Sequence, residues 1–297
     1  MRILTGLGLV ATIVVSAAAQ DGVEGEYSTD LMREVRLEQS FRTGLNMRGI
    51  SGCLLTSRTE SVYEGGLIAG VGGMMGSTAM HRMDDMHVFG LTAGVAYGLA
   101  HDLFGSLANL EVSASLPLLV RNDGNEVTTG VGDAIVSVKV QILEEQPLRE
   151  SVPSISLVLS GILPTGADEF TTVDAFGGEI GLILGKDMPA YETFGFRVYL
   201  EFIAAAINTT DGQDLQLKGN AALVMTLVNH PGYNILLEYG LVEKTAGGVG
   251  DSSSLACSGR YLADDMNVTA GFIVTTYDVL ETRIDRQFRI AYERKFK

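Results

Sequence analysis

The sequence predicts an all-β protein, a transmembrane antiparallel β-barrel of about 12 strands preceded by a short N-terminal periplasmic segment. Three observations predict this fold. Apolar and polar residues alternate along most of the chain after residue 65, glycine is abundant (36 of 297 residues) while proline is scarce (6), and longer connections alternate with short ones. Period-two alternation is typical of strands with two different faces, and frequent glycine is typical of tight turns.

The stretch 130–143 shows the alternation most simply. Every second residue from Ala134 to Ile142 is aliphatic, and Ser137, Lys139 and Gln141 lie between them. Such a strand suits a soluble sandwich, and it equally suits a membrane strand with lipid on one side and a watery lumen on the other. The other alternating runs are needed to decide between these two folds.

The alternation recurs in about 12 runs along the chain. They cover approximately residues 66–79, 87–99, 108–118, 134–142, 155–163, 180–184, 194–207, 218–228, 233–244, 255–262, 266–276 and 288–296. Longer and more acidic connections lie around residues 83, 123, 169, 211, 248 and 281, and 121–129 is predicted to be a loop. Short connections lie around residues 102, 192, 230 and 264, with 144–153 as the exception. An even strand number with long loops at one end and short turns at the other favours the outer-membrane barrel over the sandwich.

The N-terminal region differs from the rest. Residues 1–19 read as a secretory signal peptide, with Arg2 before an apolar run and Ala17-Ala18-Ala19 as the cleavage site. Residues 20–62 are predicted to form a periplasmic lead-in or a plug of the lumen, in part helical, because Ser28 is a good N-cap and Leu31 and Val35 follow at helical spacing. Residues 63–297 form the predicted barrel. No later apolar run is long enough for a spanning helix.

The polar face of the runs carries many charges, which are the candidate lumen residues. They are Glu111, Asp133, Lys139, Glu179, Arg197, Glu201, Lys218, Glu238, Lys244, Arg289 and Glu293. On one hypothesis these residues line a solute path and set its selectivity. On the other, opposite charges pair across a narrow lumen and close it. Asp133 follows two glycines where a strand opens, so it is also a candidate for accepting backbone N–H groups at a turn.

Several function classes are disfavoured by the sequence. A net charge of −15 argues against nucleic-acid binding. Cys53 and Cys257 lie far apart in no metal-type spacing, which favours two unpaired thiols, and we expect no metal and no cofactor. The segment 81–87 is expected at the outer rim, where Asp84 and His87 would be the pair of a barrel hydrolase. A solvated loop is the simpler interpretation, and we predict no catalytic residues and no enzyme.

The sequence also suggests partners in the outer membrane. The C-terminal run ends on Phe296, which is similar to the aromatic signal that bacterial outer-membrane proteins present to the barrel-assembly machinery. Aromatic residues near run ends, namely Tyr97, Tyr191, Tyr233 and Phe296, are candidates for the interfacial girdles. The acidic loop residues are expected to bridge through divalent cations to lipopolysaccharide beside the surrounding lipid. These are Asp168, Glu169, Asp174, Asp211 and Asp251.

The middle of the chain resembles a family of outer-membrane transporters associated with the meta-pathway of phenol degradation. Leu-Pro-Leu at 116–118, Gly-Val-Gly-Asp at 130–133 with the basic Lys139 after it, and Leu-Pro-Thr-Gly at 163–166 match the family in order and spacing. Residues 57–66 resemble the usual entry into its first strand, so the resemblance covers residues 57–297. It implies a barrel for uptake of hydrophobic or aromatic compounds. The matching motif residues are Gly130, Gly132, Asp133, Pro164, Thr165 and Gly166. The alternative is a structural or assembly barrel without transport, closed by its lumen charges and N-terminal segment.

Overall fold

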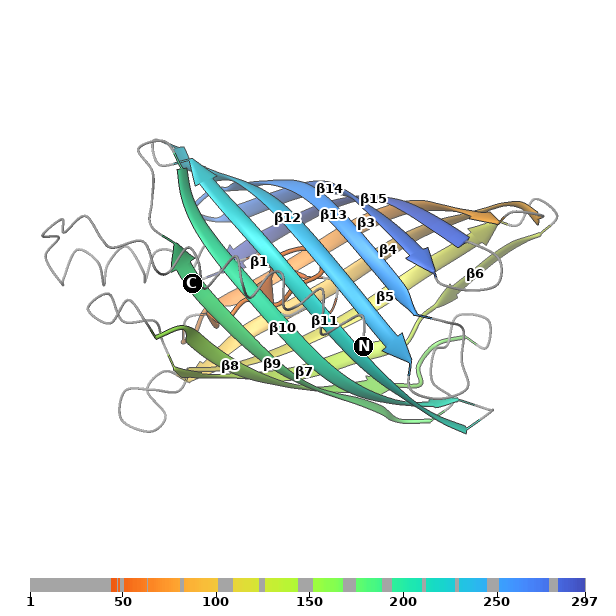
Figure 1. Cartoon of the computed structure of the whole chain (residues 1–297), viewed down its shortest axis with the longest axis horizontal. Helices are drawn as coiled ribbons and strands as arrows, with labels where there is room; N and C mark the ends of the chain where they lie inside the picture. The colour runs from red at the N-terminus through yellow and green to blue at the C-terminus, as the bar shows by residue number, and fades with distance from the viewer. Residues whose placement is uncertain are drawn as a thin grey trace, which may run out of the picture.

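The protein is a closed β-barrel in this computed structural model (Figure 1). The structure describes residues 44–46, 48, 51–62, 64–80, 83–100, 109–122, 126–143, 152–167, 175–188, 194–209, 212–227, 230–244, 251–277 and 283–296. The wall strands are β3 (Leu67–Met80), β4 (Met83–Ala100), β5 (Asn109–Asn122), β6 (Val127–Val131), β7 (Ala134–Leu143), β8 (Ser154–Leu163), β9 (Gly177–Met188), β10 (Phe194–Thr209), β11 (Gly212–Leu227), β12 (His230–Lys244), β13 (Ser252–Leu262), β14 (Met266–Tyr277) and β15 (Arg283–Phe296).

All wall strands pair antiparallel with their neighbours. β15 pairs with β3, and β4 pairs with both β3 and β5, so the sheet has no open edge. β6 and β7 both pair with β5, one after the other, and together occupy one position in the ring. The wall therefore has twelve strands, which confirms the predicted fold class. Among the residues that the structure describes, no helix is long and apolar enough to span a membrane.

The outer face of the barrel is apolar, as a wall in contact with lipid requires. Large apolar side chains such as Val71, Phe89, Leu159 and Phe272 are exposed there. Four exposed aromatic side chains, Tyr97, Tyr233, Tyr261 and Phe296, lie near the end at which β3 begins and β15 ends. The rings of Tyr233 and Tyr261 lie 5.0 Å apart. Tyr191, also predicted for such a girdle, lies outside the described residues.

Several strands are longer than the sequence predicts. β4 begins at Met83 and β11 at Gly212, where the alternation begins only at residues 87 and 218, and β9 spans Gly177–Met188 instead of 180–184. The predicted loop 121–129 contains the end of β5 and the start of β6. In each case the backbone ladder continues because the neighbouring strand satisfies its N–H and C=O groups, whatever the side-chain polarity.

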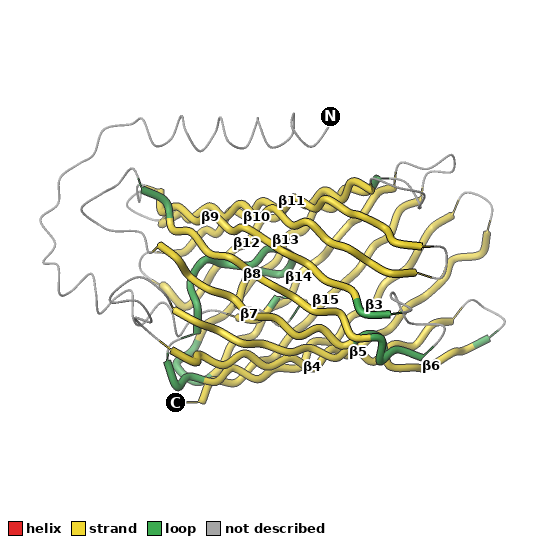
Figure 2. The backbone as a smooth tube through the Cα atoms, turned by 90° about the horizontal axis from the view of Figure 1, so that it is seen from below, coloured by secondary structure: helices red, strands yellow, loops and turns green. Residues whose placement is uncertain are grey.

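The described residues between 44 and 62, here called the lumen segment, lie inside the barrel (Figures 1 and 2). Two short strands, β1 (Gly44–Leu45) and β2 (Ser51–Gly52), pair with each other. The chain then runs along the wall and leaves through Gly65, whose φ of 76° favours glycine. The N–H of Gly65 donates to Gly98 O on β4 at 2.9 Å. The predicted signal peptide and the possible helix near residues 28–41 lie outside the described residues.

Candidate functional site

The structure brings most of the predicted lumen residues to the inner face of the wall. Among the predicted residues with described side chains, the acidic ones are buried: Glu111, Asp133, Glu179, Glu201, Glu238 and Glu293. Lys139 is buried with them, whereas Arg197, Lys218 and Arg289 are partly exposed. Lys244 is the last residue of β12, and its side chain lies outside the described part. Their partners lie both in the lumen segment and on other wall strands.

Glu238 of β12 binds the backbone of the lumen segment. Its carboxylate accepts three successive N–H groups, those of Leu54 at 2.8 Å, Leu55 at 2.7 Å and Thr56 at 2.8 Å. Bonds from neutral donors to an ionised acceptor are stronger than those between neutral groups. Because the contact is to main chain, it depends on the path of the segment and little on its side chains.

Three more wall glutamates bind the same segment in this way. Each accepts a single backbone N–H. The bonds are Leu45 N to Glu293 at 3.0 Å, Ser57 N to Glu201 at 3.3 Å, and Val62 N to Glu111 at 2.9 Å. The four glutamates come from β5, β10, β12 and β15. The segment is thus bound by wall strands on several sides of the barrel.

Ion pairs also bind the lumen segment to the wall. Arg48 pairs with Glu201 and with Glu179, the latter at 3.5 Å. On the other side, Arg197 of β10 pairs with Glu60 and Asp187. Charged side chains of the wall thus pair with the lumen segment and with a neighbouring strand.

Burial and charge change the titration of groups in the lumen segment. Burial acts to raise the pKa of the Glu60 carboxyl, but the nearby Arg197 and Arg58 guanidinium groups outweigh it and hold that pKa below its usual range. Burial raises the pKa of the Cys53 thiol to about 11. Cys53 and Cys257 are both free thiols, the former buried and the latter exposed. The expectation of two unpaired cysteines is therefore confirmed.

An apolar cluster surrounds Cys53 between the lumen segment and the wall. It contains Tyr199, Ala222, Val224 and Leu236, all buried. The Tyr199 hydroxyl donates to the Glu60 carboxylate at 2.9 Å, and the Arg58 guanidinium lies 5.6 Å from its ring centre. Tyr199 was not singled out from the sequence. Its position between Arg197 and Glu201 on the same face was the available signal.

Little open space is left beside the lumen segment at this level. A cavity of about 60 Å³ lies between Leu45 and Leu54 of the segment and the wall strands β3, β4 and β15. This part of the wall is rich in glycine, and a Cβ added at Gly70 would lie 2.6 Å from Glu293 Cγ. The lumen segment therefore packs closely against this part of the wall. No group of three or more metal-binding side chains occurs in the part of the chain that the structure describes.

The three family-like motifs meet where the wall strand is interrupted between β6 and β7. The N–H of Gly132 donates to Pro117 O at 2.8 Å. The Asp133 carboxylate accepts the N–H of Gly166 at 3.0 Å, and the Thr165 hydroxyl accepts the N–H of Ala134 at 2.8 Å. The Thr165 hydroxyl also lies 3.3 Å from Gly132 O, to which it donates. Asp133 therefore binds a backbone N–H, as its place before the strand predicted, and the motif residues stabilise a break in the ladder.

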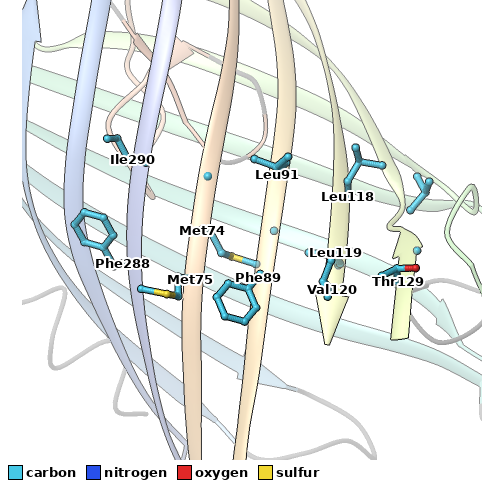
Figure 3. A pocket seen from close by; sticks show the side chains of 14 residues that line it. Met74, Met75, Phe89, Leu91, Leu118, Leu119, Val120, Thr129, Phe288 and Ile290 are labelled. Carbon is cyan, nitrogen blue, oxygen red and sulfur yellow. The ribbon is translucent and has the colours of Figure 1, made fainter. Parts of the chain in front are cut away.

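An apolar pocket of about 660 Å³ lies at the wall beside this interruption (Figure 3). Outward side chains of β15, β3, β4 and β5 form its sides, among them Phe288, Met75, Phe89 and Leu118. Gly73 creates room at its centre, because an added Cβ would lie 3.6 Å from Ile290 and 3.9 Å from Leu91. Sequence reasoning did not foresee this pocket, since it depends on which strands are neighbours.

The remaining candidate sites are only partly described. His87 is exposed on β4, opposite Ser77 and Asn122 in the sheet register. His81 and the side chain of Asp84 lie outside the described residues, so the structure does not describe the geometry of the predicted rim pair. Of the acidic loop residues, Asp251 is exposed and the other four lie outside the described part.

Comparison with known proteins supports the fold. No family model matches the chain, and no curated protein matches it in sequence. Among solved structures, an outer-membrane channel from Pseudomonas putida F1 is similar with a TM-score of 0.60 at 12% identity, covering 82% of this chain and 100% of that one. The transport unit of the autotransporter AIDA-I from Escherichia coli is similar with a TM-score of 0.47 at 8% identity, covering 90% and 99%. The CymD monoaromatic hydrocarbon channel has a TM-score of 0.41 at 7% identity, covering 78% and 89%. The first of these shares the fold of this chain. A closed barrel with an apolar outer face is the architecture of bacterial outer-membrane β-barrel proteins.

Proposed function

We propose that the protein is a passive outer-membrane channel for small solutes, apolar and aromatic compounds among them, and that the lumen segment closes it. One observation carries the proposal. The segment lies inside the barrel, and within the part of the chain that the structure describes only hydrogen bonds, ion pairs and packing hold it there. Water or a solute can replace such contacts, so the closed state is a reversible one.

The apolar features of the site support the choice of solute. The buried apolar cluster around Cys53 lies between the lumen segment and the wall, so an apolar solute that displaces the segment meets apolar side chains there. The resemblance of the motifs at 116–118, 130–133 and 163–166 to transporters of aromatic degradation agrees with this choice. The alternative, a closed structural barrel, rests on the same buried ion pairs and predicts that the segment never moves.

Crosslinking the segment to the wall tests the proposal. In a Cys257→Ser background, Ala222→Cys adds a thiol to the cluster that contains Cys53. We expect oxidation to lower solute entry in a liposome-swelling assay and a reductant to restore it. Ala204→Cys, at an outward-facing position of β10, is the matched control and should show no redox effect.

A negative result has a defined meaning. If the full chain passes neither a small sugar nor benzamide, and a variant lacking residues 20–62 also passes neither, the barrel is closed by more than its lumen segment. The structural alternative would then be the better account.

A further inference from the structure

Arg289 is a lumen cation that has no anionic partner among the residues that the structure describes. It lies on the inner face of β15, opposite Met74 of β3. Its Nη2 donates to Met74 Sδ at 3.2 Å and to Gln287 Oε1 at 3.1 Å. Its Nε is buried and has no hydrogen-bond partner in the described part of the protein. A guanidinium has five N–H donors and stays charged, so this environment leaves it under-satisfied.

Other cations on the wall are better matched. Lys139, Arg197 and Lys218 pair with carboxylates, and Arg260 donates to the backbone carbonyl of Gly52 at 2.7 Å. A thioether sulfur is a weak acceptor, so Met74 replaces such a partner poorly. A partly buried charge with few hydrogen-bond partners is unfavourable, and an anion that binds to it supplies the missing acceptors. The electrostatics at Arg289 therefore favour an anionic ligand.

The space beside Arg289 has room for a small headgroup, and an apolar body enters only when Met74 and the lumen segment move aside. Arg289 lines the cavity of about 60 Å³ between the lumen segment and the wall. Leu45, Leu54 and Met74 form apolar parts of its lining, and glycines of β3 and β4 leave the wall without side chains there. Glu293 also lines this cavity, but its carboxylate is engaged by the N–H of Leu45 at 3.0 Å and the Asn267 side chain at 3.1 Å.

We propose that Arg289 is a binding site for the carboxylate of small amphipathic acids, aromatic or aliphatic monoacids, within the lumen. The carboxylate takes the place of Met74 Sδ and accepts two parallel N–H groups of the guanidinium, the geometry that arginine provides. The apolar body lies against Met74, Leu45 and Leu54. Methionine changes rotamer easily, so Met74 can release Arg289 without moving the wall. A neutral hydrocarbon gains nothing from Arg289, and Glu293 in the same cavity disfavours a dianion.

Binding of benzoate, with benzamide as its neutral isostere, tests this site directly. We expect the full chain in a nonionic detergent to bind benzoate more tightly than benzamide in calorimetry. Arg289→Gln should weaken benzoate binding by about tenfold or more, which corresponds to about 1.4 kcal/mol, and leave benzamide unchanged. The benzoate affinity of Arg289→Lys should lie between those of the natural chain and Arg289→Gln, because lysine keeps the positive charge but not the two parallel N–H groups of the guanidinium. Arg294→Gln, on the exposed outer face of the same strand, is the control and should behave like the natural chain.

Two results would overturn the site. One is equal affinity for benzoate and benzamide in the natural chain. The other is unchanged benzoate affinity in Arg289→Gln. If Arg289→Gln fails to migrate as a folded barrel on a cold gel, the Lys variant provides the same comparison with the charge retained.

The consequence for transport rests on the proposed channel function, and the two can fail separately. If the channel proposal holds, Arg289→Gln should slow benzoate entry into liposomes while benzamide entry stays unchanged. Benzoate binding that depends on Arg289, without entry of any solute, would leave the site standing and refute the channel. Entry of both solutes at rates independent of Arg289, with no preference in binding, would leave the channel standing and refute the site.

Discussion

Lys139 of β7 and Glu111 of β5 form a buried ion pair of 3.0 Å, and each is 1% exposed. They lie directly opposite each other in the sheet register. Both also bind the lumen segment, because Lys139 Nζ donates to Glu60 O at 2.5 Å and Glu111 accepts the N–H of Val62 at 2.9 Å. A buried pair is favourable only when its remaining donors and acceptors are satisfied. The wall pair and the docked segment therefore stabilise each other.

Lys139→Met tests this dependence. It leaves Glu111 as a buried charge without its cation, and we expect the barrel to lose about 3–5 kcal/mol of stability, the usual cost of breaking one side of a buried pair. Urea unfolding in detergent measures the loss. Adding Glu111→Gln should recover part of it, because the unpaired charge disappears. If the double variant loses the sum of both single effects, the two side chains do not act as a pair.

The sequence predicts the face of each of these residues but not its partner. The alternation from Ala134 to Ile142 places Lys139 inward, and the run 108–118 does the same for Glu111. Their contact also requires the register between β5 and β7, which depends on the interruption at Gly132 and Asp133. A one-residue shift in register would turn one of them toward lipid.

The lumen segment shows a different limit. A plug was one of two predictions for residues 20–62, and the segment itself has no periodic pattern that would choose between them. It is held by main-chain N–H groups on the carboxylates of Glu238, Glu111 and Glu201. Main-chain donors are present in every sequence, so such contacts leave no signal in the amino-acid order. The sequence also does not show that Arg289 has no anionic partner among the described residues, because this depends on which side chains the neighbouring strand places opposite it.

Glu238→Gln should loosen the lumen segment. The amide can accept through only one oxygen, and its NH2 group faces an N–H donor of the segment. Loss of charged hydrogen bonds of about 1.5–3 kcal/mol shifts the equilibrium toward release about ten- to hundredfold. In a Cys257→Ser background, the alkylation rate of Cys53 at pH 8 reports the shift. Glu243→Gln on the same strand should leave the rate unchanged, and a slow rate in Glu238→Gln would show that this carboxylate does not hold the segment.

Thr165→Val removes the hydroxyl that joins two of the motifs. The variant keeps the shape but loses the bonds to Ala134 N at 2.8 Å and Gly132 O at 3.3 Å. We expect about 1–2 kcal/mol of destabilisation, measured by urea unfolding. Thr129→Val, an exposed position on β6, is the control. Equal stability of the Thr165 variant and the natural chain would mean that the motif serves something other than the strand break.

The pH dependence of Cys53 reports directly on the docked segment. Burial raises the pKa of its thiol to about 11, against an ordinary value of 9.0. The docked state thus holds the proton more tightly than the released state. The protonated thiol of Cys53 therefore stabilises the docked state. This contribution to the free energy of docking is complete below pH 9 and is lost as the pH rises toward 11.

Alkylation by iodoacetamide measures this shift in a Cys257→Ser background. The reagent reacts with the thiolate. Nearly all of the protein is in the docked state, so the pH dependence of the rate follows the pKa of the docked thiol. This holds whether the reagent reaches Cys53 in the docked segment or only after the segment is released. We therefore expect the rate to rise up to about pH 11, whereas the urea-unfolded chain should level off near pH 9.0. A folded protein whose rate levels off at the same pH as the unfolded chain would show that Cys53 is not buried between the segment and the wall, and the closed state proposed for the channel would lose its structural basis.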